Sequence, residues 1–364
     1  MNKSILRHEI KSMKWILLLS IIASFLLIVM FSMNLANTYN NIFIYGMLID
    51  QSVIQTALRY ITEMILIFFT VISIIQIFMQ FRPEKNQETG RFLKSLPIKR
   101  EEFFKIKLAI GVANITIAFI ILILGIIIAR NNNMFWIEDI YNISIMPKPY
   151  IEADSVMNLL KEIGLLYLIV LSFYGFLFMV QYTFSNVVGG IVTGILVWLS
   201  PIFIVLTSIH SLERLNIFST VSNVYTEFFN SVEQWLSPWL YPFNYDYNYF
   251  YGAYSMIKPW SINVISYLRV KYLILTGLIL ISLLIAHKFN QSSKVENENM
   301  VIPFRSIRII FIIGVTICSG LLLAFSLSEI INIRISNTIY ILLLIVGGAI
   351  GYFISSKIAK IGIK

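Results

Sequence analysis

The sequence predicts an all-α polytopic membrane protein with about eight transmembrane helices. Its 364 residues are 58% hydrophobic and only 13% charged, with a mean hydropathy of +0.79, and a soluble domain of this length could not bury so much apolar surface. A helix needs ~20 mostly apolar residues to cross ~30 Å of hydrocarbon, where every backbone polar group has to be paired. Eight stretches meet this requirement: 14–33, 60–80, 108–129, 163–184, 187–210, 268–287, 309–327 and 338–356.

The distribution of positive charge predicts the orientation of these spans. If the N-terminus lies inside, 19 of the 28 Lys and Arg residues fall on the cytoplasmic side, as the positive-inside rule requires. We therefore expect a multi-pass protein of the bacterial cytoplasmic (plasma) membrane with both termini in the cytoplasm. The net charge of +9 then reflects topology and affinity for membrane lipids with anionic headgroups. No soluble module gathers the basic residues, so nucleic acid is not an expected partner.

In front of the first span, residues 3–14 predict an amphipathic helix. Basic residues recur there every three or four positions and therefore share one side of a helix, beside an apolar stripe. Such a helix either lies in the plane of the membrane surface or forms a charged lead-in to the first span. The basic side consists of Lys3, Arg7, Lys11 and Lys14, and the stripe consists of Leu6, Ile10 and Met13.

Between the second and third spans, residues 82–107 form a charged segment that predicts two short helices split by Pro97. Proline disfavours helical geometry in the residue before it and has no amide hydrogen, so it ends the first helix. It can also start the second helix, in which Glu101 and Glu102 suit the positive end of the helix dipole. A helical pair with apolar side chains and a charged rim suits docking into a groove of a partner protein, but it could also lie on the membrane surface.

The outer connections are predicted to be long, and the larger one is predicted to contain an amphipathic helix of about five turns. We expect a polar loop over 130–162 and a larger outer segment over 211–267. Within the larger segment, apolar residues recur at helical spacing over 218–235, and two prolines then interrupt an aromatic-rich stretch. This stretch is either an ordinary aromatic belt at the headgroup level or a lid over an outer mouth. The candidates for an outer gate are Phe218, Tyr225, Phe228, Trp235 and Trp239.

Polar and small residues inside the spans predict helix packing rather than ion coupling. Glu63 lies one turn from Arg59, and a pair four residues apart on one helix face is explained without transport. A proton- or sodium-driven carrier is therefore disfavoured, because it needs carboxylates deep in the bilayer. Two glycine pairs predict close helix contacts, namely Gly190 with Gly194 and Gly347 with Gly351. Helix-bridging hydrogen bonds are expected from Gln76, Asn114 and Gln181.

Sequence signatures of an enzyme were sought and are missing. The three histidines are not at zinc-ligand spacing, and there is no G-x-S-x-G elbow. The dipeptide Gly-Lys does not occur, which excludes a phosphate-binding loop of the G-x-x-x-x-G-K-[ST] type. The single cysteine, Cys318, leaves no disulfide. We therefore expect no catalytic residue, metal or cofactor on this chain, and any ATP that drives it has to bind another chain.

Residues 88–107 read E-x-G-R-x-L-x-S-L-P-I-K-R-E-E-F-F-x-x-K. This pattern, at this place in the topology, resembles the cytoplasmic segment between spans two and three of ABC-2 type permeases, the membrane subunits of ATP-binding-cassette exporters. The resemblance covers 1–289, with 3–14 as the in-plane helix and 211–267 as the outer gating segment, whereas 290–364, a cytoplasmic linker and a C-terminal transmembrane hairpin, goes beyond the six-span core. The residues that carry the resemblance are Glu88, Gly90, Leu93, Ser95, Leu96, Pro97, Arg100 and Lys107.

The resemblance implies a permease that is driven by two separate ABC ATPase subunits, which hold the ATP and Mg. Segment 82–107 would then be the coupling helix that docks into the ATPase, and a second permease copy, identical or a close paralogue, would complete a dimer. In style the chain is similar to bacillar and clostridial permeases and to staphylococcal exporters of phenol-soluble modulins, which are amphipathic peptide toxins. The implied docking residues are Glu88, Gly90, Arg91, Phe92, Lys94, Leu96, Pro97, Arg100 and Phe103.

The scarcity of charge in the spans favours a hydrophobic or amphipathic cargo, such as a peptide or a lipid-like molecule. Among the docking residues, the aromatic and leucine side chains would supply the apolar surface and the basic ones would fix the orientation. Two other functions stay open at this point. One is a non-transporting membrane sensor or docking subunit for a cytoplasmic partner, and the other is an intramembrane lipid enzyme.

Overall fold

The computed structural model describes most of the chain and is almost entirely helical. The described residues are 3–45, 52–86, 100–143, 147–215, 235–243, 245–246, 264–265, 267–292, 300–331 and 336–361. Within them, eight helices are long and apolar enough to cross a membrane, and α5 is a short additional helix. The prediction of an all-α polytopic membrane protein is confirmed. The helices are α1 (Lys3–Phe43), α2 (Val53–Lys85), α4 (Arg100–Ile143), α5 (Pro147–Ala153), α6 (Val156–Gln181), α7 (Val187–Arg214), α9 (Leu268–Ser292), α10 (Arg305–Ile331) and α11 (Asn337–Lys360).

The predicted N-terminal helix over 3–14 is not a separate element. It forms the first turns of α1, which continues without interruption from Lys3 to Phe43. Its basic side chains are exposed where the structure describes them, whereas Met13 is buried and Ile10 is 53% exposed. The apolar stripe is therefore covered only in part, and the in-plane orientation of these turns stays a prediction.

The prediction of a polar loop over 130–162 is wrong. Helix α4 runs on to Ile143, α5 follows, and α6 already begins at Val156. The reason is visible in the apolar residues of the last turns of α4, where Trp136, Ile137 and Ile140 are buried at helical spacing together with Tyr141. The many polar residues occupy the exposed side of this extension, so composition alone was misleading.

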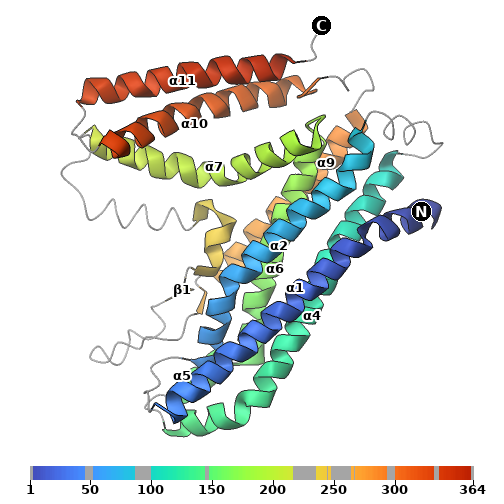
Figure 1. The fold of residues 1–364 in the computed structure, drawn as a ribbon, viewed down its shortest axis with the longest axis vertical. Coiled ribbons are helices and arrows are strands. Elements are labelled where there is room, and N and C mark those ends of the chain that lie inside the picture. Colours follow the sequence, from blue (N-terminus) through green and yellow to red (C-terminus); the bar gives the residue numbers. More distant parts are fainter. Residues whose placement is uncertain are drawn as a thin grey trace. The chain divides into compact units, whose positions relative to one another are not determined.

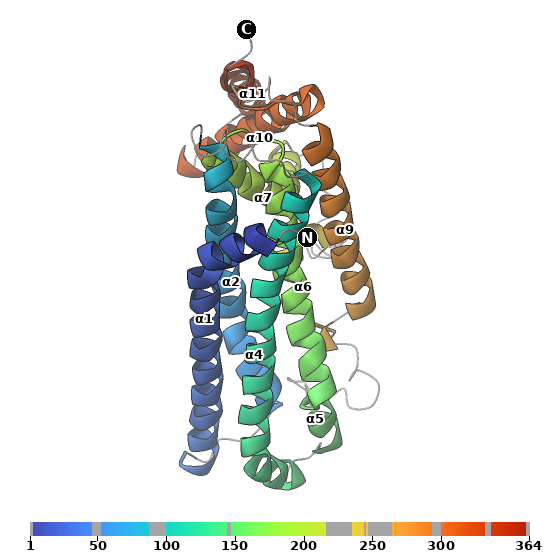
Figure 2. The same cartoon turned by 90° about the vertical axis from the view of Figure 1, so that its right-hand side faces the viewer.

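The chain divides into two compact units, which are described one at a time. Unit 1 consists of Met1–Gln80, Ile98–Gly175 and Trp239–Ile281. Within it, α1 and α4 lie side by side (Figures 1 and 2). Small residues allow this close approach: the Ser24 hydroxyl donates to the Ala118 carbonyl at 2.9 Å, and a Cβ on Gly125 would lie 2.2 Å from Ile28 Cδ1.

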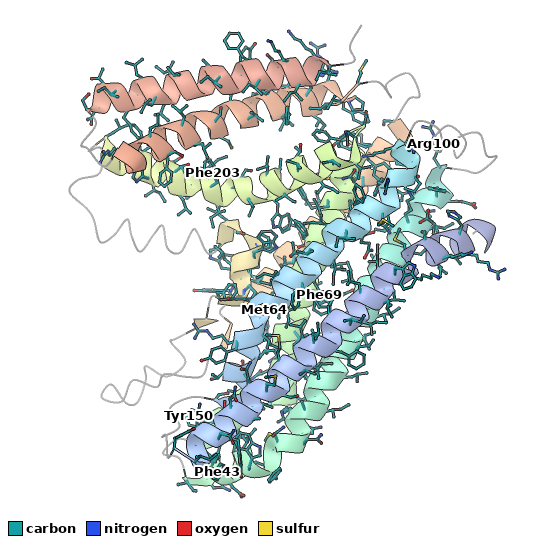
Figure 3. The ribbon with its side chains drawn as sticks, viewed as in Figure 1. Phe43, Met64, Phe69, Arg100, Tyr150 and Phe203 are labelled. Atoms are coloured by element: carbon teal, nitrogen blue, oxygen red, sulfur yellow. The ribbon has the colours of Figure 1, made fainter. Side chains whose placement is uncertain are left out.

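The helices of unit 1 have two distinct ends. Arg100 lies at one end of the helical bundle, where α4 begins, and Phe43 and Tyr150 lie at the opposite end (Figure 3). Between them, Phe69 of α2 packs on Phe119 of α4 with ring centroids 4.5 Å apart. Both ends carry buried polar side chains, and these define the sites described below.

Unit 2 consists of Phe81–Pro97, Phe176–Pro238 and Ser282–Lys364. In it, α10 and α11 form a tightly packed hairpin, and α7 packs against α10 (Figure 1). A Cβ on Gly347 would lie 2.8 Å from the Ser319 carbonyl oxygen, and one on Gly351 would lie 1.8 Å from Ser319 Oγ. The Ser319 hydroxyl donates to the Gly347 carbonyl at 3.0 Å. The close helix contact predicted from this glycine pair is confirmed.

Candidate docking site

Most of the predicted docking residues lie outside the described residues. These are Glu88, Gly90, Arg91, Phe92, Lys94, Leu96 and Pro97, and the structure describes only the two arms on either side of them. One arm is the end of α2, up to Lys85, and the other is the beginning of α4, from Arg100. Of the predicted docking residues, Arg100 is exposed and Phe103 is half-buried.

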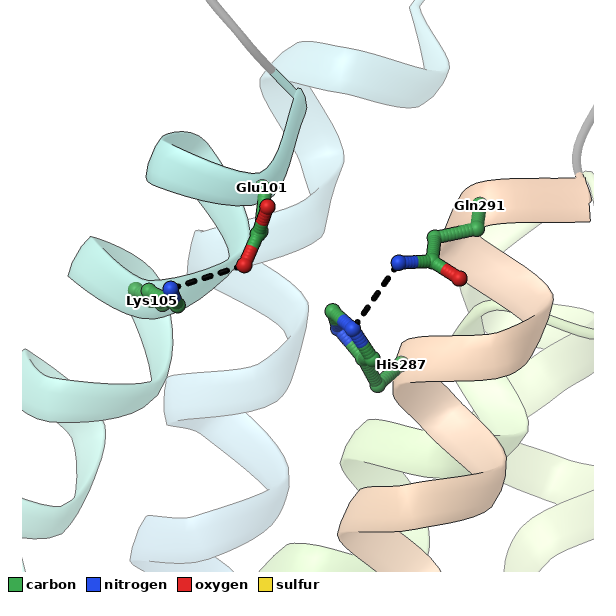
Figure 4. Close-up of polar contacts among 4 residues, drawn as sticks. All are labelled: Glu101, Lys105, His287 and Gln291. Carbon is green, nitrogen blue, oxygen red and sulfur yellow. Dashed lines mark hydrogen bonds and ion pairs between the residues drawn. The ribbon is translucent and has the colours of Figure 1, made fainter.

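The α4 arm begins as the sequence predicts. Helix α4 starts at Arg100 with Glu101 and Glu102 in its first turn, where their charge complements the helix dipole. Lys105 Nζ lies 2.7 Å from Glu101 Oε1 in an exposed ion pair (Figure 4). Such a pair holds the side chains of one helix face but contributes little to stability. Figure 4 also shows the contact between Gln291 and His287 in α9, at 3.0 Å.

A reciprocal pair of hydrogen bonds joins the two arms at their base in unit 1. The buried ammonium of Lys107 donates to the backbone carbonyl of Gln80 at 2.5 Å, and the side-chain amide of Gln80 donates to the backbone carbonyl of Lys107 at 3.0 Å. Lys107 Nζ also lies 4.9 Å from the centroid of the Phe103 ring. We call these bonds the Gln80–Lys107 clamp. They connect α2 to α4 next to the charged segment.

The clamp extends to α6 through Tyr174. The Tyr174 hydroxyl donates to Gln80 Oε1 at 3.0 Å, and the tyrosine is fully buried. Gly111 of α4 makes room for it, because a Cβ there would lie 1.8 Å from the Tyr174 hydroxyl oxygen. Gln76 and Asn114 are buried nearby on the same helices, but their side-chain nitrogens have no hydrogen-bond partner among the described residues. The prediction that these two side chains bridge helices is therefore not confirmed.

The α2 arm is anchored separately, within unit 2. Lys85 Nζ donates to the backbone carbonyl of Gln181 at 2.7 Å and to its side-chain Oε1 at 2.6 Å. The amide nitrogen of Gln181 donates in turn to the carbonyl of Val187 at 3.2 Å. The predicted bridging role of Gln181 is confirmed, and an ammonium at the last carbonyl of α6 also complements the negative end of that helix. Phe81, Phe178 and Tyr182 pack around this contact with ring centroids 5.3 to 5.4 Å apart.

A second buried polar cluster lies at the opposite end of unit 1. The carboxylate of Asp154 accepts hydrogen bonds from the hydroxyls of Ser52 and Tyr141 and from the amides of Ile54 and Gln55, the last two at 3.2 and 3.1 Å. We call this arrangement the Asp154 cap. It satisfies the free amides of the first turn of α2 from outside that helix.

Hydrogen bonds between side chains and backbone groups also fix the residues around the Asp154 cap. The Tyr141 hydroxyl accepts the amide hydrogen of Val53 at 2.8 Å, and Arg130 Nε donates to the carbonyl of Asp154 at 2.7 Å. Gln55 Nε2 donates to the carbonyl of Ala153 at 3.0 Å. Burial raises the pKa of the Asp154 carboxyl above its ordinary value, and the hydrogen bonds it accepts oppose that rise only in part.

The predicted outer gate is described only in its second half. Phe218, Tyr225 and Phe228 lie outside the described residues, and Trp235 is half-buried in unit 2. In unit 1, the 3₁₀ helix η1 (Pro238–Phe243) is held in place: the Trp239 ring lies 5.4 Å from that of Phe173, and Lys271 Nζ donates to the Tyr241 carbonyl at 3.1 Å. Burial raises the pKa of Tyr241. Short strands β1 (Tyr245–Asp246) and β2 (Val264–Ile265) pair in antiparallel fashion beyond it.

Sequence reasoning missed Asp154 and the burial of Lys107. Ser52 and Gln55 have the spacing of a capping box in front of an apolar run, which marks the start of α2 but does not indicate Asp154. In the structure, the carboxylate of Asp154 accepts from the amides of Ile54 and Gln55, and so takes the place of the Ser52 hydroxyl as the capping acceptor. Lys107 was counted among the cytoplasmic basic residues and among those that carry the resemblance, but its burial had no sequence signal.

The described residues contain no group of three or more His, Cys, Asp or Glu side chains that could hold a metal ion. No family model matches the chain, and no curated protein or solved structure matches it.

Proposed function

We propose that this chain is the membrane subunit of an ATP-binding-cassette exporter. Its charged segment docks into a separate ATPase subunit, and a second permease copy completes the assembly. The observation that supports this proposal most is the Gln80–Lys107 clamp, because it joins α2 and α4 at the base of the segment that would receive the force. Helices joined in this way move as one pair when the segment between them is displaced.

The cargo that this proposal favours is hydrophobic or amphipathic. Each of the eight candidate spans has an 18-residue window of high hydropathy with no more than two charged residues. A path lined by such helices suits a peptide or lipid-like molecule better than a small hydrophilic solute. In the cycle, ATP binding closes the ATPase pair, each ATPase displaces its docked segment, and α2 and α4 transmit that displacement into the membrane.

The test uses the full chain purified with the ATPase encoded beside its gene. Phe92→Asp and Leu96→Asp place a charge on the apolar docking surface, so we expect the ATPase to be lost on purification and hydrolysis to become independent of the permease. The matched control is Phe135→Asp, at a side chain that is 71% exposed near the other end of α4. If both docking variants retain the ATPase and its coupled hydrolysis, the proposal is wrong.

A second measurement separates export from mere docking. The purified complex is placed in liposomes with an amphipathic helical peptide, and ATP-dependent movement of the peptide across the bilayer is followed. Movement that Phe92→Asp abolishes supports the exporter. A complex that hydrolyses ATP through the docked segment but moves no amphipathic peptide would instead be a docking or sensory subunit.

A further inference from the structure

The C-terminal helix pair is connected to the turn between α6 and α7. Gln181, the last residue of α6, lies directly before this turn and accepts hydrogen bonds from Lys85. Residues 300–302 lie between the helix pair and the turn. The amide of Ser185 donates to the carbonyl of Val301 at 3.1 Å, and the Ser185 hydroxyl donates to the carbonyl of Met300. On the other side, the amide of Val301 donates to the carbonyl of Ile361, at the end of α11, at 3.4 Å.

An apolar cluster reinforces this connection. Ile302 is fully buried together with Val180, Phe184 and Ala359, and the ring of Phe184 lies 6.2 Å from that of Phe311 in α10. The cluster thus joins the end of α6, the linker in front of α10, and the last turn of α11. Each of these residues belongs to unit 2.

Gly190 packs closely against the side-chain amide of Gln181, which is hydrogen-bonded to Lys85. A Cβ at Gly190 would lie 2.9 Å from Gln181 Nε2 and 3.0 Å from Gln181 Oε1. The end of the Gln181 side chain would have to shift to make room for this Cβ. Its Oε1 is one of the two oxygens that accept from Lys85, the other being the Gln181 backbone carbonyl. The neighbouring Gly189 is different, because a Cβ there would meet only Asn186 Cβ at 3.8 Å, an ordinary contact.

We propose that α10 and α11 form a brace for the docking segment: through Ile302 and Ser185 they fix the α6–α7 turn, and through Gln181 that turn positions the Lys85 arm. Gln181 and Gly190 are positioning residues in this scheme. The proposal rests on the proposed docking function, and it gives the C-terminal pair, which lies outside the six-span pattern, a defined role.

The test measures the reactivity of Lys85 in the purified chain alone. Acetylation by an activated ester is followed by mass spectrometry, with the exposed Lys105 and Lys360 in the same sample as references. We expect Gly190→Ala to raise the acetylation rate of Lys85 about tenfold, the factor for loss of one hydrogen bond to a charged group. Gly189→Ala is the matched control and should leave the rate unchanged.

The brace itself is tested at Ile302. Ile302→Ala should raise the reactivity of Lys85 as Gly190→Ala does, whereas Ile310→Ala, at a side chain that is 65% exposed, should not. If Gly190→Ala exposes Lys85 but Ile302→Ala leaves it protected, the C-terminal helices are no brace. If Ile302→Ala does not fold, Ser185→Ala can replace it, because this variant removes only the hydrogen bond from the Ser185 hydroxyl to the Met300 carbonyl. We then expect a smaller increase in the acetylation rate of Lys85.

Two substitutions at Gln181 distinguish a role in positioning Lys85 from a general role in stability, because only one of them keeps an oxygen that can accept from Lys85. Gln181→Leu removes the side-chain acceptor and leaves Lys85 only the backbone carbonyl, so it should raise the reactivity of Lys85. Gln181→Glu keeps an acceptor oxygen and should keep Lys85 protected, although both variants lose the amide donor to Val187. Equal exposure of Lys85 in the two variants would overturn the positioning role. Because no ATPase is present, these results stand or fall independently of the docking test with Phe92→Asp.

Discussion

The two ends of the α2–α4 pair are held by buried side chains of opposite charge. At the start of α2, the carboxylate of Asp154 accepts from the amides of Ile54 and Gln55. Near the end of α2, the ammonium of Lys107 donates to the carbonyl of Gln80. Each charge matches the sign of the helix dipole at its own end. Helix α2 is therefore fixed to its neighbours at both ends, although neither charge belongs to it.

The ends differ in what they hold. The Asp154 cap has two hydroxyl and two amide donors around one carboxylate, so it stops the first turn of α2 from fraying. The Gln80–Lys107 clamp instead links three helices, because Tyr174 of α6 shares the Gln80 side chain. The Asp154 cap therefore fixes only the start of α2, whereas the Gln80–Lys107 clamp connects three helices beside the proposed docking segment. This difference leads to the following predictions, from the largest effect to the smallest.

Asp154→Ala should have the largest effect on stability. It leaves two amides and the hydroxyls of Ser52 and Tyr141 without their acceptor in a buried position, which costs about 3 kcal/mol or more. The measurement is thermal unfolding of the purified protein in detergent. Asp139→Ala is the matched control, because Asp139 is exposed in the same region of the chain, and it should leave the melting temperature unchanged. If Asp154→Ala keeps the same melting temperature as Asp139→Ala, the Asp154 cap contributes nothing to stability.

Lys107→Met should have the next largest effect. It removes the ammonium from the Gln80 carbonyl and from the Phe103 ring, at a cost of about 2 kcal/mol. The exposed Lys105 offers a matched control, since its ion pair with Glu101 should contribute less than about 0.5 kcal/mol. Both variants can be compared by thermal unfolding and by permease-dependent ATP hydrolysis. If the clamp transmits force, Lys107→Met lowers coupling and Lys105→Met does not.

Gly111→Ala should destabilise by about 1–3 kcal/mol, because its Cβ would overlap the Tyr174 hydroxyl and displace it from Gln80. Gly175→Ala is the control, since a Cβ there meets no heavy atom within 4 Å. Adding Tyr174→Phe to Gly111→Ala removes the closest atom and should recover part of the loss. An unchanged melting temperature for Gly111→Ala would contradict the close packing of α4 and α6.

The smallest predicted effect is a pH dependence of the Asp154 cap. Because the pKa of Asp154 is raised in the folded protein, its contribution to stability is fully present below the pKa of the unfolded chain and is lost as the pH rises through the folded pKa. The stability of the wild type relative to Asp154→Asn should therefore fall as the pH rises from about 4 toward neutrality. A relative stability that rises over this range would show that the folded pKa is lowered instead.

Much of the fold could be predicted because transmembrane helices are a local property. A run of apolar residues such as 108–129 has to be helical in lipid whatever surrounds it, and each of the eight predicted spans overlaps one of the eight long helices. The extension of α4 to Ile143 was missed because its exposed side is polar and only its buried side, with Trp136 and Ile140, reveals the helix. The candidate docking segment was located by its charge and its proline, but its contacts were not.

The sequence by itself determined that this chain is a helical membrane protein with eight spans and a charged segment between the second and third. Only the tertiary structure decided that Lys107 and Asp154 are buried, because their partners Gln80 and Ser52 are brought to them from 27 and 102 residues away. A charged side chain is read as exposed unless a neighbour supplies the hydrogen bonds that offset its loss of hydration. Those neighbours are set by helix packing, which no local pattern in the chain encodes.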